Sequence, residues 1–80
     1  MQAELSGIVL DCADAQCLAQ FYEALRGWPR EDAALGWAAL SAPGGWTLAF
    51  QQVPGYTPPV WPWREGAQGQ MLHLDFHVKD

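Results

Sequence analysis

A short pattern near both ends of the chain limits its possible folds more than any other feature. Apolar residues fall at every second position from Ile8 to Cys12, and the same phase runs from Leu74 to Val78. A period of two is typical of a β-strand with one buried face. An Asp lies two positions after each run, at 14 and at 80, and it can cap a helix through its carboxylate. The repeat therefore predicts two copies of a strand that leads into a helix, and we expect the second copy to continue beyond residue 80.

Composition limits the classes of protein and of partner that fit the chain. Its 80 residues suffice for one small domain. Half of them are hydrophobic and 16% are charged, which is too apolar for a disordered chain. Four basic and nine acidic residues give a net charge of −5, so no basic surface is available for phosphate groups. We therefore expect no nucleic acid and no membrane surface as a partner.

Leader sequences and cysteines bear on where the protein works. No apolar run approaches the roughly 20 residues that span a bilayer. The start, MQAELSG, has neither the basic nor the apolar region of a signal peptide. Two cysteines, Cys12 and Cys17, are too few for the disulfide framework of a small secreted domain. We expect both thiols to be reduced and at least half-buried, and the protein to be cytoplasmic.

The first part of the chain has the pattern of a strand followed by a helix. A strand is expected over 5–12 and a helix over 15–26, because Asp14 can accept a hydrogen bond at the helix start. Gly27 favours the left-handed turn that ends helices, and Pro29 blocks any continuation. The helix has an apolar stripe at the spacing of one helical face, made of Leu18, Phe21, Tyr22 and Leu25.

The middle of the chain predicts a hairpin and then a long loop. A short edge strand over 29–35 comes first. A strand over 36–41, the turn signal PGG at 43–45 and a strand over 46–53 predict a β-hairpin. Residues 54–70 form a loop rich in Pro and Trp, and loops of this length in compact domains are usually functional or linkers.

Four segments carry a resemblance to a known family: CAD (12–14), LAQFYEALRGW (18–28), WTLAF (46–50) and HLDFHVKD (73–80). Together they resemble the glyoxalase-like domain of the vicinal oxygen chelate superfamily, which includes glyoxalase I, extradiol dioxygenases and bleomycin-resistance proteins. The resemblance covers nearly the whole chain. It implies an α+β fold of paired βαβββ modules, whose curved sheet closes around a cavity with the helices outside.

The resemblance also implies a division of the chain. Residues 1–80 are one partial glyoxalase-like domain, with a first βαβββ module over 1–53, the Pro/Trp-rich loop over 54–70 and the opening strand of a second module over 71–80. Such a chain lacks the partner of its last strand. We therefore expect a homodimer, or a missing second half of the same chain.

The family's metal site is expected to be lost. Metal-dependent members hold a divalent ion with His or Glu at fixed strand positions, and the resemblance places three of these positions on Gly7, Ala49 and His73. Gly and Ala offer no donor atom, so we expect no metal and no cofactor. The alternative is a local metal set of His73, Asp75 and His77. Successive ligands along one strand lie about 6.5–7 Å apart, which is wide for a shared ion.

The expected function is binding of a small apolar or aromatic molecule in a sheet-lined cavity. A last strand over 72–78 places its apolar residues on one face and its polar residues on the other. Aromatic side chains of the loop, with Tyr56 among them, can stack on a flat ligand. The candidate ligand-binding residues are Asp11, Gln51, His73, Asp75, His77, Trp61 and Trp63.

Two alternatives from other functional classes stay open. One is a metal-dependent lyase, isomerase or dioxygenase relative that uses His73, which next to a carboxylate can transfer protons near neutral pH. The other is a protein-interaction module through the Pro/Trp loop, whose tryptophans can equally pack over a sheet edge or a dimer interface. Residues 59–64 also match the pattern PxxPxR of SH3 ligands. The identity of the ligand and the presence of an enzymatic activity are not specified by these patterns.

Overall fold

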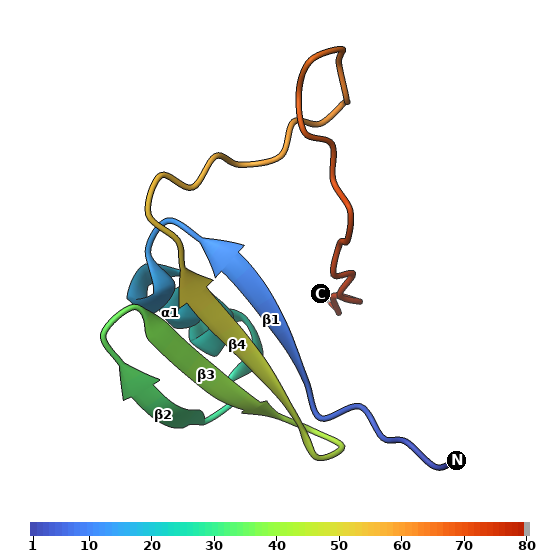
Figure 1. The fold of residues 1–80 in the computed structure, drawn as a ribbon. Helices are drawn as coiled ribbons and strands as arrows, with labels where there is room; N and C mark the ends of the chain where they lie inside the picture. The colour runs from blue at the N-terminus through green and yellow to red at the C-terminus, as the bar shows by residue number, and fades with distance from the viewer. Residues whose placement is uncertain (80) are drawn as a thin grey trace.

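The computed structural model describes residues 1–79, with all of their side chains except that of Asp32. Its elements are β1 (Gly7–Cys12), α1 (Ala15–Arg26), β2 (Arg30–Ala34), β3 (Trp37–Ala42) and β4 (Trp46–Gln52). The strands form one mixed sheet in the order β1-β4-β3-β2 (Figure 1). Strands β1 and β4 are parallel, and the other neighbours are antiparallel. The predicted α+β character and the βαβββ order of elements are confirmed.

Helix α1 begins and ends where the sequence predicts. The Asp14 carboxylate accepts a hydrogen bond from the backbone N–H of Cys17 at 3.0 Å, which satisfies a donor at the open end of the helix. At the other end Gly27 has a φ of 69°, and its N–H donates to the Glu23 carbonyl at 2.7 Å.

Among the described residues, no helix has the length and apolar character needed to cross a bilayer.

The predicted hairpin of β3 and β4 sets the central register of the sheet. Its turn, over 43–45, has positive φ angles at both glycines, a conformation that side chains disfavour. Leu40 of β3 pairs with Leu48 of β4, and Leu48 pairs in turn with Ile8 of β1. Strand β1 begins at Gly7, two residues later than predicted, and its pairing with β4 begins at Gly7 and Thr47.

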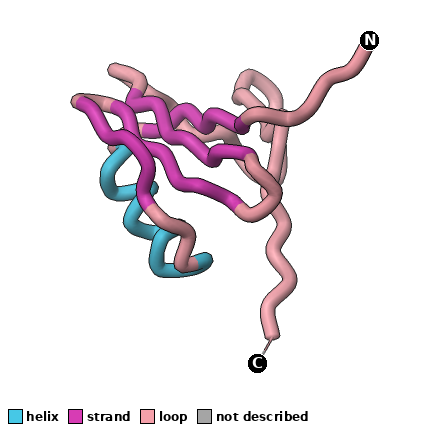
Figure 2. The backbone as a smooth tube through the Cα atoms, turned by 90° about the horizontal axis from the view of Figure 1, so that it is seen from below, coloured by secondary structure: helices cyan, strands magenta, loops and turns pink. Residues whose placement is uncertain are grey.

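The core lies between α1 and one face of the sheet, as Figure 2 shows. Leu40, Leu48 and Phe50 are fully buried there. Tyr22 of α1 stacks on Phe50, with ring centroids 5.5 Å apart. Burial of one large apolar side chain stabilises a fold by about 1.5–3 kcal/mol. This layer therefore supplies much of the stability of so short a chain.

The buried side of α1 differs from the predicted apolar stripe. Ala15 and Ala19 are fully buried, and Tyr22 is half-buried beside them. Phe21 and Leu25, which the sequence assigns to the core, are 57% and 44% exposed. Small side chains let the helix lie close to the sheet, so the contact line is centred on the alanines and the larger residues lie at its margin.

Residues 53–79, within the described chain, contain no helix or strand. The loop predicted over 54–70 is confirmed, whereas the strand predicted over 72–78 is wrong for this structure. A strand needs a neighbour that completes its backbone hydrogen bonds, and this segment has no pairing with the sheet. Its role as the opening strand of a second module, over 71–80, stays a prediction, and its last residue lies outside the described residues.

The tail, defined here as residues 72–79, contacts the rest of the protein through apolar side chains. Leu74 packs against the core cluster, and the ring of Phe76 lies 6.0 Å from that of Tyr22. The Arg26 guanidinium lies over the rings of Trp28 and Phe76, at 5.3 and 5.7 Å. Leu74 and Phe76 of the predicted apolar face therefore meet the helix side of the core, whereas Val78 is exposed and the backbone forms no strand.

Candidate functional site

The face of the sheet opposite α1 has a narrow apolar centre with polar residues beside it. Side chains that alternate with the core positions of β4 point to this face. Ala39 and Ala49 pair at its centre and are 4% and 2% exposed. Gln51 is the next residue of β4 on this face, and it pairs with Asp11 of β1. Two of the predicted site residues, Asp11 and Gln51, are thus neighbours in the sheet.

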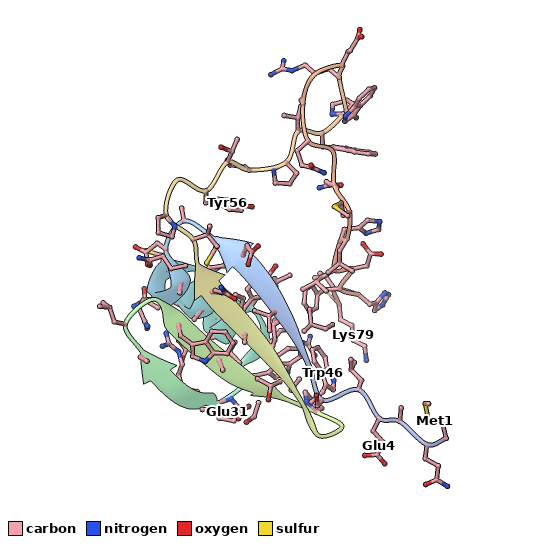
Figure 3. All side chains as sticks on the ribbon, viewed as in Figure 1. Met1, Glu4, Glu31, Trp46, Tyr56 and Lys79 are labelled. Carbon is pink, nitrogen blue, oxygen red and sulfur yellow. The ribbon has the colours of Figure 1, made fainter. Side chains whose placement is uncertain are left out.

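A cleft lies between the outer edge of β1 and the two limbs of the long loop, and we call it the edge cleft. Its volume is about 360 Å³. Three consecutive residues of β1 line it, so the cleft follows the edge of the strand rather than one face. Figure 3 shows Tyr56 beside the ends of β1 and β4. The lining residues are Val9, Leu10, Asp11, Tyr56, Thr57, Pro59, Gln68, Gly69, Met71 and Leu72.

The backbone of β1 directs hydrogen-bonding groups toward its open edge. The pairing with β4 is bounded by two bonds, from the Thr47 N–H to the Ser6 carbonyl at 3.0 Å and from the Val53 N–H to the Cys12 carbonyl at 2.9 Å. In a parallel pair, alternate residues of a strand bond to the neighbouring strand. The residues at positions 7, 9 and 11 therefore direct their N–H and C=O groups outward, toward the edge that the cleft follows.

The tip of the long loop folds on itself. The Val60 N–H donates to the Gln68 carbonyl at 2.7 Å and closes a compact loop. Inside it the Trp63 indole N–H donates to the Ala67 carbonyl at 2.7 Å. Trp61 and Trp63 are 75% and 60% exposed. Because this tip projects away from the sheet (Figure 1), neither tryptophan lines the edge cleft.

The polar residues of the tail are exposed and lie outside the edge cleft. His73 Nδ1 lies 3.0 Å from Asp75 Oδ1, and the two side chains are 68% and 85% exposed. Water competes for such a pair, so it contributes little to stability. His77 is exposed as well. Over residues 1–79, no group of three or more His, Cys, Asp and Glu side chains is placed to hold a metal ion, so the alternative metal set is not assembled there.

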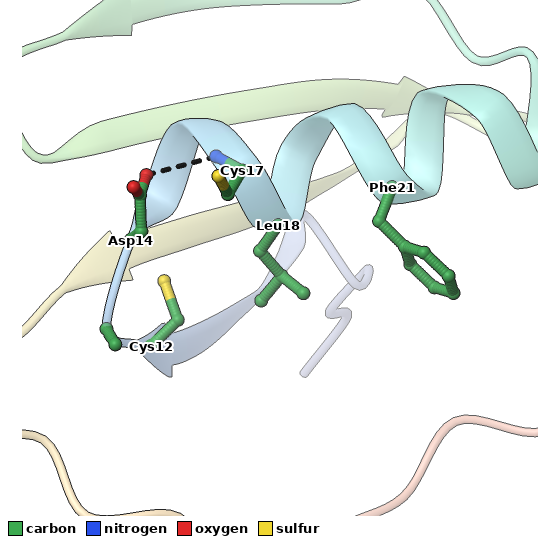
Figure 4. A pocket seen from close by; sticks show the side chains of 6 residues that line it. Cys12, Asp14, Cys17, Leu18 and Phe21 are labelled. Carbon is green, nitrogen blue, oxygen red and sulfur yellow. Dashed lines mark hydrogen bonds between the residues drawn. The ribbon is translucent and has the colours of Figure 1, made fainter.

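A second cleft, of about 420 Å³, lies where β1 passes into α1 (Figure 4). Cys12, Cys17 and Phe21 are among its lining residues. Its carboxylate, that of Asp14, already caps the helix. Cys12 is buried as predicted, but the prediction for Cys17 is wrong: this residue is exposed, because the third helical position points away from the sheet. With its only carboxylate engaged, this cleft is a weaker candidate than the edge cleft.

The sequence of this βαβββ unit matches a known protein family. The family model described as the glyoxalase-like domain matches residues 7–80. The chain belongs to this family. The matched range begins at β1 and includes all five elements, and it confirms the resemblance seen in the sequence. No curated protein and no solved structure matches the chain.

Two of the positions that the sequence resemblance assigns to the family's metal have no side-chain donor atom in this chain. One position falls on Gly7 of β1, and another falls on Ala49, which is 2% exposed in the centre of the sheet. Neither side chain can bind a metal ion. The third position, His73, lies on the tail, which does not pair with the sheet. Gly7 and Ala49 therefore supply no side-chain ligand to a metal ion.

Sequence reasoning found only part of the edge cleft of the glyoxalase-like domain. It selected Asp11 and drew attention to Tyr56, but it missed Gln68 and Met71 on the returning limb of the loop. The one available signal was the apolar pair Met71-Leu72 directly after a polar stretch. Such a pair shows that a segment meets apolar surface somewhere, but it does not say which strand edge the segment passes.

Proposed function

We propose that this glyoxalase-like domain binds a small apolar or aromatic molecule in the edge cleft, without the family's metal ion. The observation that carries the proposal is a cleft of about 360 Å³ between a strand edge and both limbs of the loop. Small-molecule sites commonly have about 300–1,000 Å³ and mainly apolar walls with a few polar groups. The walls of the edge cleft have this composition.

The walls of the edge cleft make different contributions to such binding. Tyr56 supplies a flat ring, and Met71 and Leu72 supply adaptable apolar surface that is now exposed to water. A ligand that covers these two side chains removes apolar area from water, which is the usual source of binding free energy. Asp11 and Gln68 supply the polar groups that orient a ligand.

An NMR titration with 2-naphthylmethanol, a neutral aromatic probe, tests the proposal. We expect backbone amide shifts over residues 9–11 and 68–72. Tyr56→Ala should weaken the Kd about two- to tenfold, since an aromatic contact contributes about 0.5–1.5 kcal/mol. Trp61→Ala, outside the cleft, is the control and should leave the Kd unchanged. Shifts confined to other residues, or equal losses in both variants, would contradict the proposal.

A second candidate function is a protein-interaction module at the tip of the loop. The observation that favours it is the exposure of Trp61 and Trp63, 75% and 60%, on a hydrogen-bonded loop that projects from the sheet. Exposed aromatic anchors are typical of protein interfaces. Loss of a stoichiometric protein partner on Trp61→Ala, with unchanged affinity for 2-naphthylmethanol, would support this second function. An enzymatic role of His73 stays a prediction.

We also propose that a second copy of the chain, or further residues of the same chain, completes the domain. The exposed Phe21 and Leu25 of α1 support this, because such side chains gain by being covered. The tail, which has no strand partner, supports it as well.

Cys12 and Cys17 are both free thiols, which supports the cytoplasm as the place where the protein works.

A further inference from the structure

We infer that Cys12 and Cys17 form a redox-sensitive switch, in which hydrogen peroxide oxidises the two thiols to a disulfide and thereby changes the junction between β1 and α1. The inference goes beyond ligand binding, since it concerns a change in the fold itself. Its basis is a pair of free thiols that line one cleft, at the point where a strand passes into a helix.

Both cysteines belong to the junction, and both line the cleft of about 420 Å³ that lies there. Cys12 is the last residue of β1, and Cys17 is the third residue of α1. Figure 4 shows the Cys12 sulfur pointing from the end of β1 toward the first turn of α1, which carries Cys17. Side chains of a helix lean toward its N-terminus, so the Cys17 side chain leans back toward the end of β1.

The first turn of α1 folds back over the residues that follow Cys12. The Cys17 N–H donates to the Asp14 carboxylate at 3.0 Å, and the Leu18 N–H donates to the Asp14 carbonyl at 3.1 Å. Asp14 is two residues beyond Cys12, and two residues span at most about 7 Å. A disulfide joins residues whose Cα atoms are about 4.4–6.8 Å apart. The N–H groups of a first turn have no partner within the helix, so this turn can move toward Cys12 while the rest of α1 stays intact.

The different exposure of the two thiols sets the order of the chemical steps. Cys17 is exposed, so hydrogen peroxide reaches it first and transfers one oxygen to its sulfur, which gives a sulfenic acid and one water. The Cys12 sulfur then attacks the sulfur of this sulfenic acid. The S–S bond forms, and the hydroxyl group leaves as water with the proton of the Cys12 thiol. The two thiols together lose two electrons and two protons, and the peroxide is reduced to two waters.

The disulfide replaces contacts that hold the junction in the reduced protein. The Cys12 sulfur lies 3.5 Å from the Gln51 carbonyl, and it leaves this position when it bonds to Cys17. Movement of the first turn also weakens the cap that Asp14 gives to the Cys17 N–H. Oxidation therefore changes the end of β1, the start of α1 and the neighbouring residue of β4. The cytoplasm keeps such a pair reduced until an oxidant appears, which is the usual condition of a redox-sensing pair.

Mass spectrometry of the full chain after treatment with hydrogen peroxide tests the inference. Digestion with trypsin, without a reductant, releases residues 1–26 as one peptide that contains both cysteines. We expect this peptide to lose about 2 Da, the mass of two hydrogens, and to regain it with dithiothreitol. Cys12→Ala should stop at the sulfenic acid, which dimedone traps on Cys17, and Cys17→Ser should form no disulfide. In NMR spectra of the oxidised wild-type chain, amide shifts should change over residues 12–18 and at Gln51, and stay the same over 60–68.

Three results would overturn the inference: a wild-type peptide that keeps its mass, a wild-type Cys17 that is trapped by dimedone without any disulfide, or a disulfide between two chains. A disulfide that forms with no change in the amide shifts over 12–18 would overturn its role as a switch. The wild-type measurement decides the matter even if a variant fails to fold. None of these results bears on ligand binding, which the titration with 2-naphthylmethanol tests separately.

Discussion

At the scale of single residues, two cysteines five positions apart have opposite environments. The Cys12 thiol is buried and lies 3.5 Å from the Gln51 carbonyl, whereas Cys17 is exposed in the first turn of α1. Burial raises the pKa of the Cys12 thiol above its ordinary value, because the thiolate would lose hydration. A hydrogen bond from the Asp14 backbone opposes this rise, and the negative charges of Asp14 and Asp11 add smaller effects that raise the pKa. Cys12 is therefore a neutral apolar side chain of the core.

The raised pKa of Cys12 predicts a loss of stability at alkaline pH. The folded protein keeps this thiol protonated at a pH where the unfolded chain has lost the proton. The stability that the protonated thiol contributes is therefore fully present below the pKa that Cys12 has in the unfolded chain. It is lost as the pH rises through the pKa that Cys12 has in the folded protein. We expect the free energy of unfolding to fall more in the wild-type chain than in Cys12→Ala between about pH 8 and pH 10.

Urea unfolding at both ends of this pH range measures the effect. Cys17→Ala is the matched control and should lose as much stability as the wild-type chain, since its thiol is exposed. If the free energy of unfolding falls no more in the wild-type chain than in Cys12→Ala, the buried thiol is not the cause of the pH dependence.

At the scale of elements, the position of the tail depends on the end of α1. Phe76 lies between the rings of Tyr22 and Trp28, with centroid distances of 6.0 and 6.4 Å, and the Arg26 guanidinium covers it. These contacts hold a segment that has no backbone pairing with the sheet. The side chains, rather than a ladder of hydrogen bonds, therefore determine where the tail lies.

Phe76→Ala should release the tail while the sheet stays folded. We expect NMR order parameters over 72–79 to fall below about 0.6, the range of a flexible backbone. The free energy of unfolding should fall by about 1 kcal/mol, as expected for lost aromatic contacts. Val78→Ala, at a position that is 73% exposed, serves as the control and should leave the order of the tail unchanged. A tail that keeps its order without Phe76 would contradict the proposed attachment.

At the scale of the whole molecule, the exposed apolar residues of α1 lead to a prediction about assembly. Phe21 and Leu25 are four positions apart, so they lie on one side of the helix, and both are substantially exposed. We expect the chain to form a dimer in sedimentation experiments. Phe21→Glu should weaken the dimer at least tenfold, because it places a charge in an apolar contact.

Gln20→Glu is the matched control for the assembly prediction. It adds the same charge at an exposed position on another side of α1, because residues one and five positions apart do not face each other on a helix, so the dimer should persist. A wild-type chain that stays monomeric at all concentrations, or a dimer that survives Phe21→Glu, would assign another role to these two residues.

Local physical chemistry made much of the fold predictable from the sequence. The capping oxygen of Asp14 and the left-handed Gly27 act within one helical turn, so the bounds of α1, 15–26, were predicted correctly. The glycine turn at 43–45 specified the hairpin in the same way. The family was also visible in the sequence, because its segments include these same local signals. Strand alternation alone placed Asp11 and Gln51 on one face of the sheet, but of these two residues only Asp11 lines the edge cleft.

Only the tertiary structure decided which distant segments meet. The alternation over 72–78 is that of a strand, but a strand exists only where a neighbour accepts its hydrogen bonds, and here the side chains dock instead. The apolar stripe of α1 predicted that Phe21 lies in the core. The small Ala15 and Ala19 instead determined how the helix lies on the sheet. The edge cleft joins β1 to residues about 60 positions later, a contact that depends on the path of the whole loop and that no local pattern encodes.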